Sequence, residues 1–339
     1  MSATLPFLSL SQRTLALGLC LLVGVGLVWY VLGGPAPSTN EATRAVVIRP
    51  QTGAFDIARR LKEARVIRSR VAFLAVAVAR GTQRRLLAGE YEFVPGLNLL
   101  EVVRRLEQGK GFVHQVTIPE GFSARQIAEA LQGKGLVDQD RFMSLLRDRQ
   151  LLTQYRVDGE SLEGYLFPDT YRLTKGLGEE AIIGLMVQRF TEVFGPAERA
   201  RAIELKMSVA QVVTMASLIE REAKADEERP LISAVFHNRL RLGMPLQSDP
   251  TVLYSLSRFS GKLTKTNLRA RSPYNTYLHR GLPPGPIASP GRASVKAALY
   301  PASSRYLYFV SKNNGTHAFS NTLREHGAMV RRYQIRRAG

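Results

Sequence analysis

The most apolar stretch of the chain lies near its N-terminus, and shorter periodic patterns follow it. From Thr14 to Gly33 no residue is charged, and twenty residues rising about 1.5 Å each match the roughly 30 Å core of a bilayer. A cleaved signal peptide has a shorter apolar region. We therefore expect a membrane-spanning helix over 14–33. Arg13 lies before this stretch and Glu41 is the first charge after it, which predicts a cytoplasmic N-terminus at 1–13 and an exported remainder.

A linker rich in proline, serine and threonine at 34–43 leads into a pattern that occurs twice. Each copy predicts a short strand, a turn with proline and glycine, and an amphipathic helix. The elements expected are strands at 46–50, 89–94 and 116–119, and helices at 57–61, 97–106 and 127–131. We assign 44–160 to a small α+β region. It is either a domain without a site of its own or a LysM-like carbohydrate-binding module, and the repeat supports only the architecture.

The rest of the chain, 161–339, predicts a mainly helical domain with one short β-hairpin, so the fold class expected is α+β. An aromatic and acidic segment, Ser161–Leu173, opens it and suits either a sugar-binding cleft or an ordinary domain seam. The helices expected lie at 182–205, 208–224 and 229–242 and from 321 onward, and the hairpin strands lie at 306–310 and 316–320 around an Asn-Asn-Gly turn.

Charge changes this picture more than overall composition does. The 339 residues are 45% hydrophobic and 22% charged, which is globular composition, but 47 Lys and Arg against 28 Asp and Glu give a net charge of +19. Such a chain suits an acidic partner: nucleic acid, an anionic membrane surface or a polyanionic polymer. Export argues against nucleic acid. The only cysteine, Cys20, lies inside the predicted span, so we expect no disulfide framework and no cysteine metal site.

The helix expected from Ser208 carries the strongest candidate for chemistry. Glu222 continues its apolar stripe, three residues after Ile219 and seven after Met215. A carboxyl group at the end of such a stripe loses water, and the loss raises its pKa, as a general acid requires. The alternative is an ion pair with an arginine and no further role. Glu220 is the fallback, but it points about 200° away and is expected on the solvent-facing arc.

The sequence lacks the motifs of several other kinds of enzyme. There is no G-x-S-x-G, S-x-x-K or H-E-x-x-H sequence, and the five histidines are scattered, so we expect no metal and no cofactor. A second carboxylate beside the first would suggest an ordinary glycosidase. Asp249 is the candidate, although Ser248-Asp249-Pro250-Thr251 also predicts a helix N-cap with proline at the first helical position. We prefer the cap.

Taken together, the motifs of this chain resemble those of the endolytic murein transglycosylase family (MltG/YceG). The resemblance covers nearly all of the chain beyond the predicted span and rests on several motifs in the same order, none of which would suffice alone. They are Leu166–Tyr171 (LFPDTY), Met215–Glu222 (MASLIERE), Glu228-Arg229, Val235–Leu240 (VFHNRL), Gly243–Val252 (GMPLQSDPTV), Ser272–Tyr277 (SPYNTY), Gly281–Ile287 (GLPPGPI), Tyr306–Val310 (YLYFV) and His317–Ser320 (HAFS).

The resemblance implies a single-pass inner-membrane enzyme with a LysM-like region and a periplasmic catalytic domain at 161–339. Such enzymes cut between N-acetylmuramic acid and N-acetylglucosamine within peptidoglycan strands, consume no water and leave a 1,6-anhydro end. They act without a cofactor, terminate growing strands and work beside peptidoglycan synthases, the penicillin-binding proteins. The family's catalytic glutamate corresponds to Glu222, although Ala223 replaces the small hydroxyl residue common at the next position. The residues expected to line the substrate cleft are Gln247, Ser248, Asp249, Tyr274, Asn275 and Tyr277.

Two alternatives from other classes stay open at this point. One is a membrane-anchored peptidoglycan-binding scaffold, which would bind sacculi and release nothing. The other is a hydrolytic muramidase with Asp249 as base or nucleophile, which would add water and leave reducing ends.

Overall fold

The computed structural model describes residues 43–335 except 110 and 257–262. The predicted membrane span and cytoplasmic N-terminus lie outside these residues. Within the described part, no single helix is long and apolar enough to cross a membrane. One neighbouring pair, α9 (Pro196–Glu204) and α10 (Val209–Glu222), passes the same test of length and composition together, but it is bent by 94°.

The chain divides into two compact units that differ from the predicted domains. Unit 1 holds the residues up to His114 together with 172–178, and unit 2 holds 115–171 and 179–339. The predicted boundary at 160/161 is therefore not where the chain divides. The two copies of the repeat form the strands and helices expected of them, but they belong to different units, because the second copy buries its apolar residues within unit 2.

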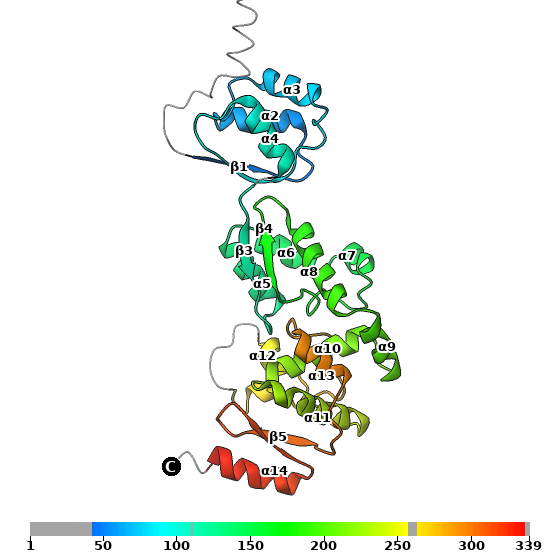
Figure 1. The fold of residues 1–339 in the computed structure, drawn as a ribbon. Coiled ribbons are helices and arrows are strands. Elements are labelled where there is room, and N and C mark those ends of the chain that lie inside the picture. The colour runs from blue at the N-terminus through cyan, green and yellow to red at the C-terminus, as the bar shows by residue number, and fades with distance from the viewer. Residues whose placement is uncertain (1–42, 110, 257–262, 336–339) are drawn as a thin grey trace, which may run out of the picture. The chain divides into compact units, whose positions relative to one another are not determined.

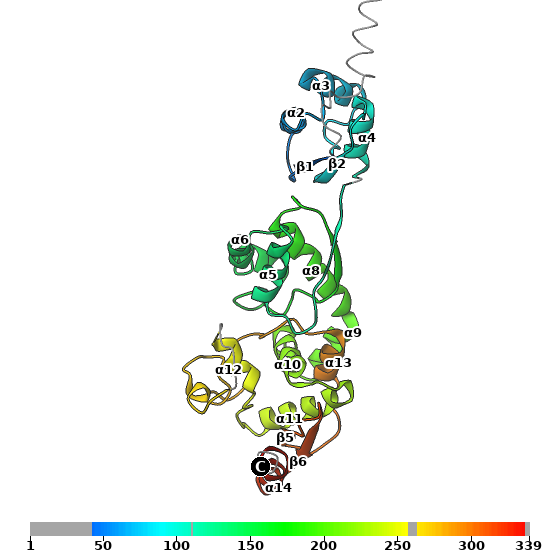
Figure 2. The same cartoon turned by 90° about the vertical axis from the view of Figure 1, so that its left-hand side faces the viewer.

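Unit 1 is an antiparallel pair of strands packed with three helices, two of which lie between the strands in the sequence (Figures 1 and 2). Strand β1 (Arg44–Ile48) pairs antiparallel with β2 (Gly89–Phe93), with Val46 opposite Tyr91. Helices α2 (Ala54–Glu63), α3 (Arg70–Ala79) and α4 (Leu99–Gln108) pack around them. Val46 and Ile48 alternate with less buried residues on β1, and they share one core with a buried stripe of each helix. The sequence predicted the stripes of α2 and α4 but not helix α3.

The returning segment 172–178 belongs to unit 1 because of two contacts. The buried carboxylate of Glu90, on β2, lies 3.1 Å from Nζ of Lys175 and 2.6 Å from Nε2 of His114. Gly176, at φ 84°, leaves no room for a side chain, since a Cβ atom would lie 2.7 Å from Cγ1 of Val47. These contacts hold both chain segments that leave the unit.

Unit 2 begins with most of a β-strand pair and with four helices. Strand β3 (His114–Thr117) pairs with β4 (Thr170–Leu173). His114 of β3 and residues 172–173 of β4 are counted in unit 1. The helices are α5 (Ala124–Gly133), α6 (Gln139–Leu145), α7 (Arg149–Gln154) and α8 (Glu179–Val193). The predicted helix over 182–205 is two helices, α8 and α9, because Gly195 caps the second and Pro196 occupies its first turn.

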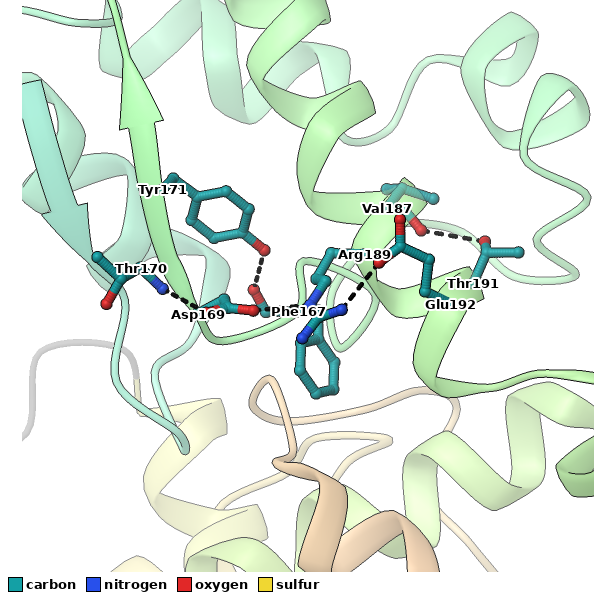
Figure 3. A network of polar contacts seen from close by, with 8 residues as sticks. All are labelled: Phe167, Asp169, Thr170, Tyr171, Val187, Arg189, Thr191 and Glu192. Atoms are coloured by element: carbon teal, nitrogen blue, oxygen red, sulfur yellow. Dashed lines mark hydrogen bonds and ion pairs between the residues drawn. The ribbon is translucent and has the colours of Figure 1, made fainter. Parts of the chain in front are cut away.

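The Phe167–Tyr171 segment is tied to α8 by a polar network (Figure 3). Nε of Arg189 lies 2.7 Å from Oδ2 of Asp169, and its Nη1 lies 2.8 Å from Glu192. The hydroxyl of Tyr171 donates to the carbonyl of Phe167 at 2.5 Å. The side chains of Asp169, Arg189 and Glu192 are each more than a third exposed, so this network joins the segment to α8 at the surface. Pairing with α8 favours the domain-seam interpretation of the segment.

The second half of unit 2 is built on the buried helix α10. Helices α11 (Arg229–Arg241) and α13 (Arg292–Leu299) pack against it, as both views show. Helix α12 (Asp249–Ser255), strands β5 (Tyr308–Ser311) and β6 (His317–Ser320), and α14 (Leu323–Val330) complete the unit, with short turns of helix at Asp226–Glu228, Asn267–Arg269 and Arg331–Ile335. The predicted hairpin is confirmed, with Tyr308 opposite Ser320.

Candidate active site

Helix α10 positions both candidate glutamates. It begins with a capping box in which Ser208 accepts from the backbone of Gln211 and the side chain of Gln211 accepts from Ser208, as the sequence predicts. It ends at Glu222, two residues earlier than expected, because Ala223 is extended. Every residue from Val212 to Ile219 is buried. The helix is therefore a rigid support that presents its last carboxylate beyond the core.

Glu222 is partly buried, and among the described residues its hydrogen-bond partner is Ser248. The hydroxyl of Ser248 donates to its Oε1 at 2.6 Å. Burial raises the pKa of Glu222 to about 7, although the hydrogen bond from Ser248 acts to lower it. The charge of Asp249 raises this pKa further, and that of Arg239 opposes it. A carboxyl group with this pKa holds a proton for much of the time at neutral pH, so it can donate one and then take one back.

Ser248 is held in place by two cross-linked loops. Its backbone N–H donates to Oγ1 of Thr276 at 2.9 Å, and the same Oγ1 lies 2.9 Å from Oγ1 of Thr251. The N–H of Gln247 donates to the carbonyl of Thr276 at 3.1 Å. Gln247 has φ 50°, a conformation that non-glycine residues rarely adopt. The two loops thus fix the serine, while the side chain of Gln247 is exposed.

Asp249 does not take the cap position that we preferred for it. Ser248 is the N-cap of α12, and Asp249 is the first helical residue, followed by Pro250. The exposed carboxylate of Asp249 accepts a hydrogen bond from the hydroxyl of Tyr277 at 2.6 Å. Burial, and then this bond, raise the pKa of Tyr277 above its usual value. Asp249 therefore lies beside the candidate acid, paired with a tyrosine.

Two other predicted binding residues have different surroundings. The ring of Tyr274 packs on that of Tyr254, with centroids 4.9 Å apart, and is partly exposed. Asn275 is fully buried, and its Nδ2 donates to the carbonyls of Leu268 and Ala270. Its oxygen accepts from the N–H of Tyr277 at 3.0 Å. The structure therefore makes Asn275 a support of the loop that carries the two tyrosines.

Glu220 has the ion pair that we considered for Glu222. Its Oε1 lies 3.4 Å from Nη2 of Arg229, and its Oε2 accepts from the N–H of Gly291, at the start of α13, at 3.0 Å. Only 7% of its side chain is exposed, so the expected solvent-facing position is wrong. The two glutamates do lie on different sides of α10, and Glu220 serves to join α10, α11 and α13.

Two further candidate residues, Arg239 and Glu163, were not identified from the sequence. Arg239 is buried, donates to the carbonyls of Leu246 and Leu307 at 2.7 Å each, and lies close enough to lower the pKa of Glu222. Its position three residues after Phe236 continues the buried stripe of α11, by the same pattern that singled out Glu222.

Glu163 is the second of these candidates, and no hydrophobic periodicity in the sequence predicts that it is buried. Its Oε1 accepts from the N–H of Ala124, the first residue of α5, and its Oε2 from the hydroxyl of Tyr254 on α12. Burial raises the pKa of Glu163 to about 7. Because Tyr254 packs on Tyr274, this second buried acid supports the tyrosine side of the site.

Among the described residues, no three histidine, cysteine, aspartate or glutamate side chains converge as metal ligands. The fold and the site define the class: an α+β protein whose helical unit presents Glu222, partly protonated at neutral pH, beside Ser248 and near Tyr277. A second glutamate with a raised pKa, Glu163, lies beside Tyr254, which packs on Tyr274. Such an arrangement suits acid–base chemistry on a polar substrate.

Comparison with known proteins identifies the family of this chain. The YceG-like family profile matches residues 46–332, and the chain belongs to that family. It is 34% identical over 315 residues to an endolytic murein transglycosylase of Bacillus subtilis, covering 88% of this chain and 87% of that one. An endolytic murein transglycosylase of Streptococcus pneumoniae is 28% identical over 338 residues, covering 89% of this chain and 60% of that one.

A solved structure agrees with these relatives. A crystal structure of a yceG-like protein from Listeria monocytogenes matches with a TM-score of 0.59 and 34% identity, over 86% of this chain and 99% of that chain. The family resemblance drawn from the motifs is confirmed.

Proposed function

We propose that this chain is an endolytic murein transglycosylase that cuts the bond between N-acetylmuramic acid and N-acetylglucosamine within peptidoglycan strands. The observation that carries the proposal is the carboxyl group of Glu222, held by Ser248 and kept partly protonated near neutral pH by burial. Membership of the YceG-like family and two relatives that carry this name support the choice of substrate.

The mechanism we propose uses Glu222 twice. Protonated, it donates to the leaving glycosidic oxygen, and the bond to the anomeric carbon breaks. The substrate's 2-acetamido group stabilises the positive charge, which is a known exception to catalysis by two carboxylates. Glu222, now ionised, takes the proton of the C6 hydroxyl as that oxygen attacks the anomeric carbon. The product is a 1,6-anhydro ring and no water is consumed, so the enzyme is a lyase.

The residues around Glu222 have distinct tasks in this proposal. Ser248 orients the carboxyl group and steadies its ionised form. Asp249 and Tyr277 form one hydrogen-bonded pair able to contact sugar hydroxyls, and Tyr274 offers a ring face for stacking. Gln247 is exposed at the end of its loop. The pairing of Asp249 with Tyr277 favours a binding role for Asp249 over that of a second catalytic carboxylate.

The experiment is mass analysis of the muropeptides released from purified sacculi by the full-length protein. We expect anhydro-ended products and none from the Glu222→Gln variant. Glu220→Gln is the matched control, since it alters the same helix but affects the ion pair with Arg229 and the hydrogen bond from Gly291 and leaves Ser248 in place, and it should keep activity while losing stability. Products with reducing ends would show that the enzyme is a hydrolytic muramidase and not a lyase. Sacculus binding without products would favour a scaffold, and full activity of Glu222→Gln would refute the assignment of the catalytic acid.

The surroundings of the enzyme are part of the same proposal. The uncharged run at 14–33 would anchor it in the inner membrane with unit 1 and unit 2 in the periplasm. Unit 1 would be the LysM-like glycan-binding region, and peptidoglycan synthases would be its neighbours there. A basic exported body suits both anionic headgroups and strands that carry peptide carboxylates.

A further inference from the structure

Helix α3 of unit 1 has an apolar face that the described residues do not cover. Its inner face buries Phe73, Val76 and Ala77. On its other side, Val71 is 76% exposed and Val78 is 62% exposed. A surface helix ordinarily carries polar residues on this side.

The exposed apolar residues of α3 follow helical spacing. Val71, Ala75 and Val78 are exposed at intervals of four and three, and Leu74 beside them is partly buried. Between Arg70 and Ala79 the helix has no polar side chain at all. The stripe is therefore continuous along the whole helix, unlike a single stray valine.

The two neighbouring helices show that this is particular to α3. Helices α2 and α4 have the same length of ten residues. Their outer faces carry charged side chains, such as Arg59 and Lys62 on α2 and Arg104 on α4. Phe55 on α2 and Leu100 on α4 are also exposed, but each lies among charged residues of its helix. Of these three helices, α3 alone has no polar side chain after its first residue, so its sequence suits an apolar partner.

The charges around α3 indicate what that partner is. From Arg59 to Arg85 there are nine arginines and lysines and one acidic residue, Glu63. Arg70, at the start of α3, is exposed, and so are Arg84 and Arg85 in the loop that follows the helix. A short apolar helix surrounded by basic side chains fits the interface of a bilayer that contains anionic lipid.

The proposed membrane anchor puts such a surface within reach. The predicted span ends at Gly33 and β1 begins at Arg44. The ten residues between them reach at most about 35 Å when fully extended. This tether keeps unit 1 close to the bilayer, so that a weak surface contact becomes effectively intramolecular.

We propose that the exposed face of α3 docks on the surface of the membrane in which the chain is anchored, with Val71 and Val78 in the interface and the arginines on anionic headgroups. This inference rests on the membrane anchor in the proposed function. It would hold unit 1 against the bilayer and limit how far unit 2 ranges from it.

The test uses full-length protein in which Cys20→Ala removes the only cysteine. An environment-sensitive fluorophore is attached at Val71→Cys or at Ile203→Cys. Ile203, on α9 of unit 2, is the matched control because it is 75% exposed. Both proteins are reconstituted into phosphatidylcholine vesicles with phosphatidylglycerol, and co-flotation and quenching by nitroxide lipids are measured.

We expect the label at position 71, and not the one at 203, to shift to the blue and to lose several-fold more fluorescence to the nitroxide lipids. High salt, or omission of phosphatidylglycerol, should weaken this difference. Equal behaviour of the two labels in protein that co-floats would overturn the docking and leave the anchor standing. A blue shift without quenching would place a second protein copy on α3, which also overturns it. Protein that fails to co-float would overturn the anchor and the docking together, while release of anhydro-ended products reports on the enzyme separately.

Discussion

Replacing Ser248 by alanine removes the hydrogen bond that the described part of the chain donates to the side chain of the candidate acid. The hydroxyl of Ser248 donates to Oε1 of Glu222 at 2.6 Å and thereby favours the ionised carboxylate. Ser248 is also the N-cap of α12, but its side chain makes no capping bond. The substitution therefore removes the bond to Glu222 without uncapping the helix.

The magnitude follows from the strength of such a bond. A hydrogen bond to a charged group contributes about 1.5–3 kcal/mol, and one pKa unit corresponds to about 1.4 kcal/mol. Because Glu222 is partly exposed, we take the lower end, a rise of about one unit above its pKa of about 7. A general acid works in its protonated form, so activity should persist to higher pH in the variant.

The assay is the pH dependence of anhydromuropeptide release, with Ser255→Ala as the control. Ser255 lies on the same helix, and its hydroxyl donates to the carbonyl of Val252 instead. We expect the alkaline limb of the profile to move up by about one pH unit in Ser248→Ala and to stay in place in the control. An unchanged limb, or one displaced to lower pH, would refute the assignment of Glu222 as the acid or of Ser248 as its partner.

Three further predictions concern stability. The raised pKa of Glu222, about 7 against 4.5, gives stability that is present below pH 4.5 and lost as pH rises through 7. Glu222→Gln should therefore stabilise the protein at pH 8, by up to about 3 kcal/mol, and not at pH 4, in urea unfolding at the two pH values. Gly164→Ala should cost about 3 kcal/mol in the same assay, since Gly164 has φ 83° and a Cβ atom would lie 2.5 Å from Pro286; a neutral result would refute this packing. Burial acts to raise the pKa of Glu90, but hydrogen bonds from His114 and Lys175 hold it below its usual value. The stability that the lowered pKa of Glu90 contributes is present above the unfolded pKa and is lost as pH falls through the folded one. Glu90→Gln should therefore cost about 2 kcal/mol at pH 7 and less once acid protonates the carboxyl group in the folded protein, as thermal unfolding can check.

Local sequence patterns predicted most of the helices and strands, because hydrophobic periodicity and capping residues act within one segment of the chain. Alternation placed β2, apolar stripes placed α4 and α11, and the Ser208 and Gln211 pair placed the start of α10. The same logic selected Glu222, since a residue that continues a buried stripe must share its face. The prediction of one helix over 182–205 missed the break between α8 and α9, which Gly195 and Pro196 mark in the sequence; α9 itself buries only Ala202.

The residues that complete the site come from distant parts of the chain, so no local pattern could bring them together. Ser248 reaches Glu222 across 26 positions and Glu163 reaches Tyr254 across 91. We predicted that Asn275 binds substrate, but an asparagine between turn residues is common both in binding sites and in structural turns. Its buried hydrogen bonds to the carbonyls of Leu268 and Ala270 identify the structural role.

The sequence by itself determined the net positive charge and the family, it predicted most of the strands and longer helices, and it gave the export of the chain and the identity of the candidate acid as expectations. Each of these depends on spacing, composition or ordered motifs along one chain. The tertiary structure decided that the chain divides near His114, that Glu220 is an interior ion pair and that Glu222 is the carboxyl group held by a serine. The physical reason is that burial and partner choice, which set a pKa and define a unit, depend on which distant segments pack together.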